Sequence, residues 1–185
     1  MSAVRAIPDP LDLEVRISPM RRRHLRSVLR IEAQVYPRPW SLGLFMGELA
    51  MRNGRVYLVA RVGPNVVGYA GLLFSGPDGH ITTIAVDPAW HRLGIGARLL
   101  LELSRQAIAR EAQSLTLEVR VSNDAAQSMY QRFGFAPAGV RKGYYAETGE
   151  DAIVMWVHDI GTDEYAQRLA GIEASISGRT ILDDE

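Results

Sequence analysis

The stretch from His80 to Glu111, HITTIAVDPAWHRLGIGARLLLELSRQAIARE, carries the strongest structural signals in the chain. Its apolar, β-branched beginning, Ile81 to Val86, predicts a strand that ends at Asp87-Pro88. A glycine-bearing turn then leads into a helix from about Gly96 to Glu111 with one apolar stripe. Backbone N–H groups at a helix start are unpaired and lie at the positive end of the helix dipole. The turn Arg92-Leu93-Gly94-Ile95-Gly96-Ala97 therefore predicts an anion site, and a ligand with a diphosphate is the first hypothesis.

Length, charge and cysteine content limit the class of protein. The 185 residues are enough for one domain with a substantial core. The 21 basic and 21 acidic residues cancel, so no overall field favours nucleic acid or a membrane surface as a partner. The absence of cysteine excludes disulfides, thiolate metal sites and a cysteine nucleophile. No apolar run approaches the roughly 18–20 residues that span a bilayer, and no signal-peptide core is present, so a cytoplasmic protein is expected.

The hydrophobic pattern predicts an α/β (α+β) fold, a mixed sheet flanked by helices, because antiparallel hairpins surround one β-α-β crossover. Strands are expected at about residues 13–17, 55–61, 66–74, 80–86, 115–119, 135–141 and 152–158. Helices are expected at about residues 20–35, 41–51, 96–111, 123–133 and 162–176. We expect a flexible N-terminal arm at residues 1–11, one domain at residues 12–160, and an extension at residues 161–185 made of a short helix and a disordered tail.

Charged residues in the predicted helices are interpreted as solvent-facing. Arg98 and Glu102 are four residues apart and are expected to pair on the outer side of the helix at 96–111. The basic run from Arg21 to Arg26 is compatible with nucleic-acid binding, but a solvated helix face is favoured because the whole chain is neutral.

A rival interpretation of the glycine turn is a dinucleotide-binding fingerprint. The segment Gly94 to Leu99 nearly matches its spacing, and Glu118 lies about 20 residues on, where a ribose-binding acid is found. However, Leu99 replaces the third glycine, and the residues between Val86 and Gly94 are too many for that tight turn. Antiparallel hairpins also precede the turn, so we reject this interpretation.

Four sequence blocks carry a resemblance to a known family. AVDPAWHRLGIGARLL (Ala85–Leu100) resembles the acyl-CoA-binding signature of the GNAT acetyltransferases, in which a Gln/Arg-x-x-Gly-x-Gly/Ala turn holds the diphosphate of coenzyme A. PWS (39–41), LEVRVSNDAAQSMYQRFGF (117–135) and RKGYYAETGEDAIVM (141–155) resemble blocks of the RimI-type subgroup, which acetylates the N-terminal alanine of a small-subunit ribosomal protein. The resemblance covers about residues 13–158 and implies the GNAT fold, with a mixed, mostly antiparallel central sheet.

The resemblance implies how acetyl-CoA, the acyl donor, is held. The backbone of Ile84, Ala85 and Val86 is expected to bind the pantetheine arm like an added strand, with an N–H near Val86 polarising the thioester carbonyl. Residues 92–97 are expected to bind the diphosphate. Asn123 is expected to hydrogen-bond the cofactor arm.

The resemblance also assigns catalytic groups, Glu118 as general base and Tyr130 as proton donor. The chemistry agrees, because an α-amine is mostly protonated near neutral pH and must lose a proton before it attacks a thioester. Taken alone, Glu118 would be a solvated strand residue and Tyr130 a core residue on an apolar helix stripe, but the motif context favours the catalytic roles. Trp40, Tyr144 and Tyr145 are candidates for lining the acceptor cleft, and packing roles for them stay open.

The four histidines, His24, His80, His91 and His158, lack metal-ligand spacing, and no metal is expected. His91 stands where the family has Gln or Arg. We expect this difference to change cofactor affinity only modestly, because backbone N–H groups supply most of the contacts of the turn with the diphosphate. The leading hypothesis is direct acetyl transfer, in a ternary complex, to a protein N-terminus, with a ribosomal protein as partner. Two alternatives stay open: acetylation of lysine side chains or a small amine, and an acyl-CoA-sensing interaction module.

Overall fold

One continuous sheet organises the computed structural model, which describes residues 6–184. The strands are β1 (Glu14–Pro19), β2 (Arg55–Val62), β3 (Asn65–Ser75), β4 (Asp78–Val86), β5 (Ser114–Arg120), β6 (Ala136–Tyr145), β7 (Glu150–His158) and β8 (Arg179–Leu182). The helices are α1 (Leu25–Val35), α2 (Leu42–Ala50), α3 (Ile95–Ala109), α4 (Asp124–Arg132) and α5 (Asp163–Ser175), with 3-10 turns at Arg22–His24 and Pro88–Trp90. The strand order is β6-β7-β5-β4-β3-β2-β1-β8. Neighbours are antiparallel except for the parallel pairs β4–β5 and β1–β8, so the expected mixed, mostly antiparallel sheet is confirmed.

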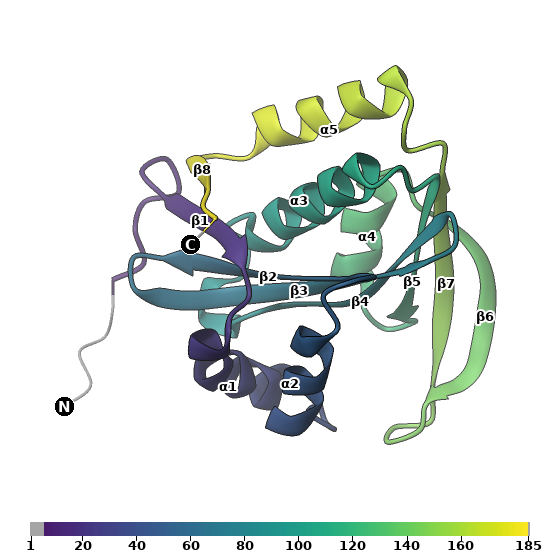
Figure 1. The fold of residues 1–185 in the computed structure, drawn as a ribbon, viewed down its shortest axis with the longest axis horizontal. Coiled ribbons are helices and arrows are strands. Elements are labelled where there is room, and N and C mark those ends of the chain that lie inside the picture. The colour runs from purple at the N-terminus through teal and green to yellow at the C-terminus, as the bar shows by residue number, and fades with distance from the viewer. Residues whose placement is uncertain (1–5, 185) are drawn as a thin grey trace.

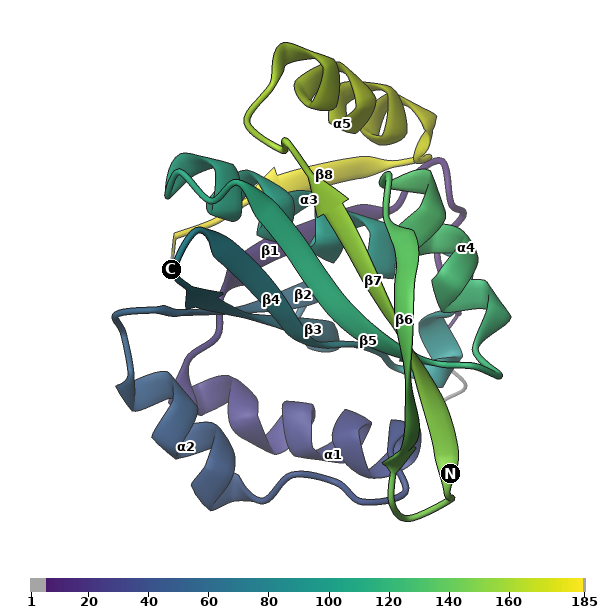
Figure 2. The same cartoon turned by 90° about the vertical axis from the view of Figure 1, so that its right-hand side faces the viewer.

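Helices cover both faces of the sheet (Figures 1 and 2). Helices α1 and α2 pack on one face, and α3, α4 and α5 lie on the other. On the α3 side, Leu99, Leu100 and Leu103 are fully buried against the sheet. On the opposite face, Val28 of α1 packs in a second cluster with Tyr69 of β3. The apolar stripe expected at residues 96–111 is therefore the side of α3 that faces the sheet.

Three helix starts that the sequence predicts are confirmed by their capping side chains. Ser41 Oγ, Asn123 Oδ1 and Thr162 Oγ1 each accept the N–H of the residue three positions later, at 3.2, 3.1 and 3.2 Å. Each bond satisfies a backbone donor that the first turn of a helix leaves unpaired. These side chains fix the beginnings of α2, α4 and α5.

The surface ion pair predicted on α3 is wrong. Arg98 and Glu102 are buried, with 2% and 9% of their surface exposed. Arg98 donates to oxygen atoms of Leu93, Ser177 and Thr180, and Glu102 accepts a hydrogen bond from the side chain of Gln106. The physical reason is that α5 and the chain after it lie over this side of α3 (Figure 1).

The disordered tail predicted after α5 is also wrong for residues 179–182. These residues form β8, which pairs in parallel with β1 from Glu14–Arg179 to Ile17–Leu182. Part of the arm expected at residues 1–11, residues 1–5, lies outside the described residues, and residues 6–9 have no regular secondary structure. Within residues 6–184, no helix combines the length and the apolar character needed to cross a membrane.

Candidate active site

A gap between β4 and β5 forms the centre of the candidate site. The parallel register of these strands ends at the pair His80–Thr116. An extra residue, Thr82, interrupts the pairing of β4 with β3 just beyond this point, and a bulge of this kind bends a strand. Strand β5 stays paired with β7 as far as Arg120. The two strands therefore diverge, and the edge of β4 at residues 81–86 has no strand partner on this side within the described chain.

The backbone of β4 presents hydrogen-bonding groups to this gap. Just after β4, the Asp87 N–H donates to Val67 O on the β3 side at 2.8 Å. Because backbone groups point to alternate sides along a strand, those of Ala85 face β3, whereas those of Ile84 and Val86 face the gap. Of the three residues expected to hold an extended ligand, Ile84 and Val86 thus have the suitable orientation, and Ala85 is directed to its partner strand.

Two side chains from other segments already bond the edge of β4. The Tyr36 hydroxyl donates to Ile84 O at 3.4 Å and shares a hydrogen bond of 3.0 Å with Thr83 Oγ1. Burial raises the pKa of Tyr36, so its hydroxyl keeps its proton at neutral pH. The His91 Nε2–H donates to Val86 O at 3.1 Å. The unusual His91 therefore contacts the same strand edge as the expected ligand.

The glycine turn lies at the end of this edge. Arg92 and Gly94 both have left-handed backbone, with φ of 63° and 73°. Helix α3 begins at Ile95, so the N–H groups of its first turn have no acceptor within the helix. A Cβ at Gly94 would lie 2.9 Å from Arg98 Nη1, which leaves no room for a side chain. The turn thus leads directly into a helix start, as the sequence predicts, and the binding of an anion there stays a prediction.

The remaining residues of the turn differ in their exposure to solvent. Leu93 and Gly96 are half-buried, and Ile95 and Ala97 are buried.

Glu118 lies on β5 just past the last pair with β4, where the gap begins. Its Oε2 accepts a hydrogen bond of 2.6 Å from His80 Nε2, and its Oε1 lies 3.5 Å from Arg141 Nη2 of β6. The Glu118 side chain is 11% exposed, so it is mostly shielded from solvent but can still be reached from the gap. A carboxylate held by an imidazole beside an open strand edge is suited to taking a proton from an incoming group.

Tyr36, Tyr130 and Tyr145 lie near one another, and Tyr145 is also near the Glu118 carboxylate. Tyr130 of α4 is buried and packs against Phe135, with 5.8 Å between ring centres. Burial, and then the neighbouring Tyr36 and Tyr145, raise the pKa of Tyr130, so its phenol is protonated at neutral pH. Burial also raises the pKa of Tyr145 to about 12, with a contribution from the charge of Glu118. Tyr145 is thus close to both residues expected to be catalytic.

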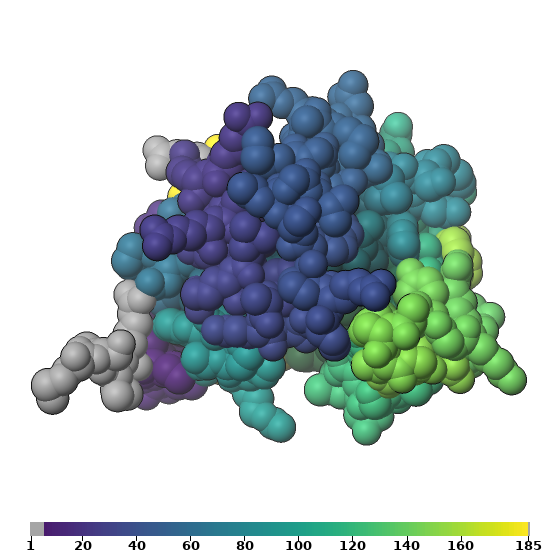
Figure 3. Space-filling view, turned by 90° about the horizontal axis from the view of Figure 1, so that it is seen from below, coloured from purple at the N-terminus to yellow at the C-terminus, as the bar shows by residue number. Residues whose placement is uncertain are grey.

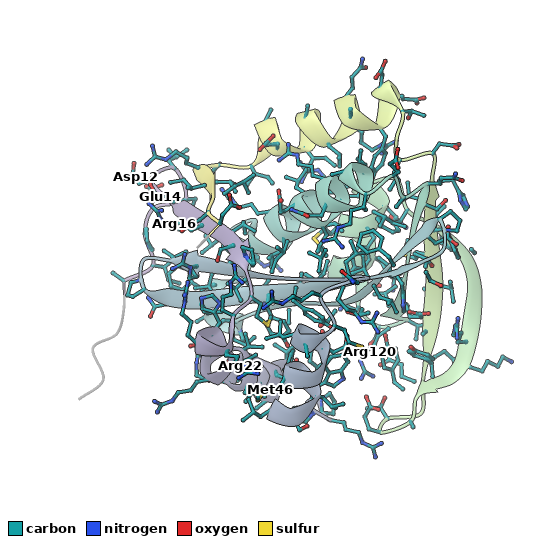
Figure 4. The ribbon with its side chains drawn as sticks, viewed as in Figure 1. Asp12, Glu14, Arg16, Arg22, Met46 and Arg120 are labelled. Atoms are coloured by element: carbon teal, nitrogen blue, oxygen red, sulfur yellow. The ribbon has the colours of Figure 1, made fainter. Side chains whose placement is uncertain are left out.

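The β6–β7 hairpin forms one wall and is fixed to β5 by Arg120, which Figure 4 labels. The Arg120 guanidinium pairs with Glu147 at 2.5 Å and Glu150 at 3.3 Å, and lies 3.8 Å from the centre of the Tyr145 ring. Tyr144 contacts Tyr145 edge-on at 5.1 Å and is 46% exposed. Seen from the α1–α2 side, the hairpin tip lies next to these helices (Figure 3). Both tyrosines expected in the acceptor cleft therefore belong to this wall.

The loop between α1 and α2 carries Trp40, the third candidate. Its ring packs on Phe45 at 5.4 Å, and its backbone N–H donates to Glu32 Oε1 at 3.0 Å. The buried Glu32 also accepts the Tyr69 hydroxyl, and burial raises the pKa of this carboxyl. Trp40 thus has a packing role in the loop, and its contact with an acceptor stays a prediction.

His80, Tyr36 and Arg141 are site residues that the sequence did not predict. His80 is the first residue of the stretch from His80 to Glu111, and its spacing from the other histidines gives no sign of this contact. Its partner Glu118 lies 38 residues later, and only the parallel pairing of β4 with β5 brings the two together. The side-chain oxygen of Asn123 caps α4, and a hydrogen bond from its amide N–H groups to the cofactor arm stays a prediction.

Fold and site together define an acetyltransferase. Residues 25–135 match the Acetyltransferase (GNAT) family, so the chain belongs to this family and is an N-acetyltransferase. Enzymes of this family take the acetyl group from acetyl-CoA.

Within this family, the chain is similar to several N-terminal acetyltransferases. The N-alpha-acetyltransferase RimI of Mycobacterium tuberculosis is 38% identical over 147 residues, which cover 76% of this chain and 90% of that protein. The ribosomal protein bS18-alanine N-acetyltransferase of Salmonella typhimurium is 35% identical over 133 residues, 71% of this chain and 88% of that one. The crystal structure of the ribosomal-protein-S18-alanine N-acetyltransferase from Escherichia coli matches with a TM-score of 0.71 at 29% identity, over 78% of this chain and 94% of that one. The predicted GNAT fold is thereby confirmed.

The residues present fit acetyl-CoA. An extended arm can add to the edge of β4 that lacks a strand partner through the N–H groups of Ile84 and Val86, whose carbonyl oxygens also accept from Tyr36 and His91. A diphosphate can accept hydrogen bonds from the N–H groups at the start of α3, which have no acceptor within the helix. Among residues 6–184, no group of three or more His, Asp or Glu side chains is arranged to hold a metal ion.

Proposed function

We propose that the chain transfers the acetyl group of acetyl-CoA to the α-amine of a protein N-terminus, and that a ribosomal protein beginning with alanine is its acceptor. The names of the Salmonella typhimurium and Escherichia coli relatives support this acceptor. In this proposal both substrates are bound together and no acyl-enzyme forms. The absence of cysteine supports direct transfer, since the commonest acyl-accepting nucleophile is missing.

The observation that carries the proposal is the pair formed by Glu118 and His80 at the beginning of the β4–β5 gap. Acetyl-CoA, when bound, supplies an acetyl thioester. The amine arrives mostly as an ammonium, because α-amino groups have pKa values of about 7.7–8.0. The Glu118 carboxylate removes a proton from it, directly or through a water molecule, while His80 fixes the orientation of the carboxylate.

The opposite proton transfer falls to Tyr130. Because burial raises its pKa, the phenol remains protonated and can donate to the departing sulfur. The hairpin residues Tyr144 and Tyr145, whose rings contact each other edge-on, flank the route of the acceptor. We assign substrate contacts to these two residues and to Trp40.

A peptide assay tests this function. One peptide begins with alanine and contains an internal lysine, and its matched control carries a blocked N-terminus. Each is incubated with the enzyme and acetyl-CoA, and mass spectrometry locates the added acetyl group. Modification of the free α-amine alone supports the proposal. Modification of the lysine in both peptides, or of polyamines instead of peptides, refutes the N-terminal acceptor. Tight acetyl-CoA binding without turnover on any amine, together with a stable protein partner, indicates the sensing module.

A further inference from the structure

The C-terminal extension, residues 161–184, is folded against the domain beside the glycine turn. Helix α5 lies along α3 (Figure 1), and the Tyr165 hydroxyl donates to Phe133 O at 2.9 Å. An ion pair of 2.5 Å joins Arg105 of α3 to Glu173 of α5. The family match ends at residue 135, so α5 and β8 lie outside it. Like β6 and β7, the extension lies beyond the matched residues, and it is in close contact with α3 and the end of α4.

An open cavity of about 240 Å³ lies between this extension and the turn. Its walls are residues 92–94 of the turn, Ala97 of α3, Arg132 of α4, residues 175–177 and Pro10. Pockets that enclose a whole drug-sized ligand measure roughly 300–1,000 Å³, so this cavity suits one part of a ligand. Two arginines and no carboxylate line it, which favours an anionic group.

Arg98 connects the turn to the extension beneath this cavity. Its guanidinium donates to Leu93 O at 2.9 Å, to Ser177 O, and through Nε to Thr180 Oγ1 at 2.9 Å. All three partners are neutral, and no ion pair joins Arg98 to a carboxylate within residues 6–184. Buried charges in proteins are normally paired. An uncompensated buried cation behind the turn therefore favours a bound anion in front of it.

The two arginines of the cavity are also free of carboxylate partners in the part of the chain that the structure describes. Arg132 donates to Ser175 Oγ, a residue of the extension. Arg92 is exposed, has a left-handed backbone and lines the cavity. Paired guanidinium groups suit a phosphate, because the planar fork matches two phosphate oxygens.

From this arrangement we propose a second anion subsite, built by Arg92, Arg132 and the C-terminal extension, which binds the phosphomonoester on the ribose of coenzyme A. The inference rests on the proposed function, because it takes coenzyme A as the ligand and its diphosphate as the occupant of the turn. A phosphomonoester carries nearly two negative charges at neutral pH. Its attraction to two guanidinium groups is therefore stronger than that of a diphosphate oxygen. The extension closes the subsite by holding Arg132 through Ser175.

Calorimetric titration with coenzyme A and with dephospho-coenzyme A tests the subsite. The wild type is expected to bind coenzyme A about 5- to 20-fold more tightly than the dephospho form, as for one charge-assisted contact at an exposed site. Arg132→Ala is expected to reduce this ratio to about twofold or less without changing the affinity for dephospho-coenzyme A. Arg26→Ala removes an equal charge from an exposed position of α1, on the opposite face of the sheet, and should leave the ratio unchanged.

Three outcomes overturn the inference. If the wild type binds both ligands equally, the subsite is absent while the proposed function stands. If Arg132→Ala weakens both ligands to the same extent, this residue serves the diphosphate or the fold instead. If neither ligand binds the wild type, the proposed function fails as well.

Hydrogen exchange supplies a measurement that does not depend on a variant. Exchange in residues 176–182 should slow more with saturating coenzyme A than with saturating dephospho-coenzyme A, because the extra phosphate ties the extension to α4. Equal protection by both ligands would contradict the role of the extension.

Discussion

Replacing His80 tests the central contact of the site. The His80 Nε2–H donates to Glu118 Oε2 at 2.6 Å, and among the described residues the one arginine that pairs with this carboxylate is Arg141, at 3.5 Å. In His80→Ala the carboxylate loses its closest hydrogen-bond donor and the side chain that fixes its direction. Since the amine must meet a correctly oriented base, we expect turnover to fall more than cofactor binding.

The size of the effect follows from the type of contact. Hydrogen bonds to charged groups contribute about 1.5–3 kcal/mol, and the lower part of this range applies because the His80 side chain is 30% exposed. A loss of about 1.5–2 kcal/mol in transition-state stabilisation lowers kcat about 10- to 30-fold. His80→Gln retains an N–H donor and should recover most of this loss.

Steady-state kinetics with the alanine peptide, combined with calorimetry for coenzyme A, measures both quantities. His158→Ala is the matched control, because His158 bonds Ser114, four residues before Glu118 on β5, or about 13 Å along the strand. An unchanged kcat in His80→Ala refutes the positioning role. An equal loss in the control variant, or no recovery in His80→Gln, assigns the effect to the sheet rather than to the contact.

The remaining predictions concern the catalytic groups, the turn and acid stability. Glu118→Gln and Tyr130→Phe should each lower kcat about 100-fold or more while the affinity for coenzyme A changes little, and wild-type rates in both variants would exclude the assigned roles. Gly94→Ala should lower Tm by about 2–8 °C and weaken coenzyme A binding, because a side chain at φ 73° costs about 1–2 kcal/mol, whereas Gly47→Ala, with free space in α2, should do neither. Burial, and then nearby arginines, lower the pKa of His24 from 6.5 to about 4. Because the unfolded chain then binds a proton that the folded chain does not, urea titrations should show about 1–3 kcal/mol less stability at pH 4 than at pH 7, a loss that is absent in His24→Gln.

Local signals were sufficient to predict most of the fold. Capping residues such as Ser41 and Thr162 lie next to periodic apolar segments, and a helix start depends on contacts within four residues. The turn at Gly94 could also be predicted from the sequence, because its left-handed backbone and the strand before it depend on neighbouring residues alone. The catalytic assignments for Glu118 and Tyr130 came from the motif resemblance and stay predictions.

Features that depend on distant segments were missed. Periodicity identifies the side of α3 that faces the sheet, but it does not reveal that α5 covers the other side and buries Arg98. The pairing of β8 with β1 joins segments about 165 residues apart, and its polar composition resembles that of a disordered tail. The contact of His80 with Glu118 likewise requires knowledge of which strands are neighbours.

The short strand β8 has a consequence for association between molecules. A row of unpaired backbone groups on an outermost strand can recruit another chain, and proteins limit this with short, charged outer strands. β8 covers the outer side of β1 with four residues, and Arg179 pairs there with Glu14, which Figure 4 labels. In a chain shortened to residue 158, the outer side of β1 would be uncovered. We expect such a chain to self-associate in solution through that strand.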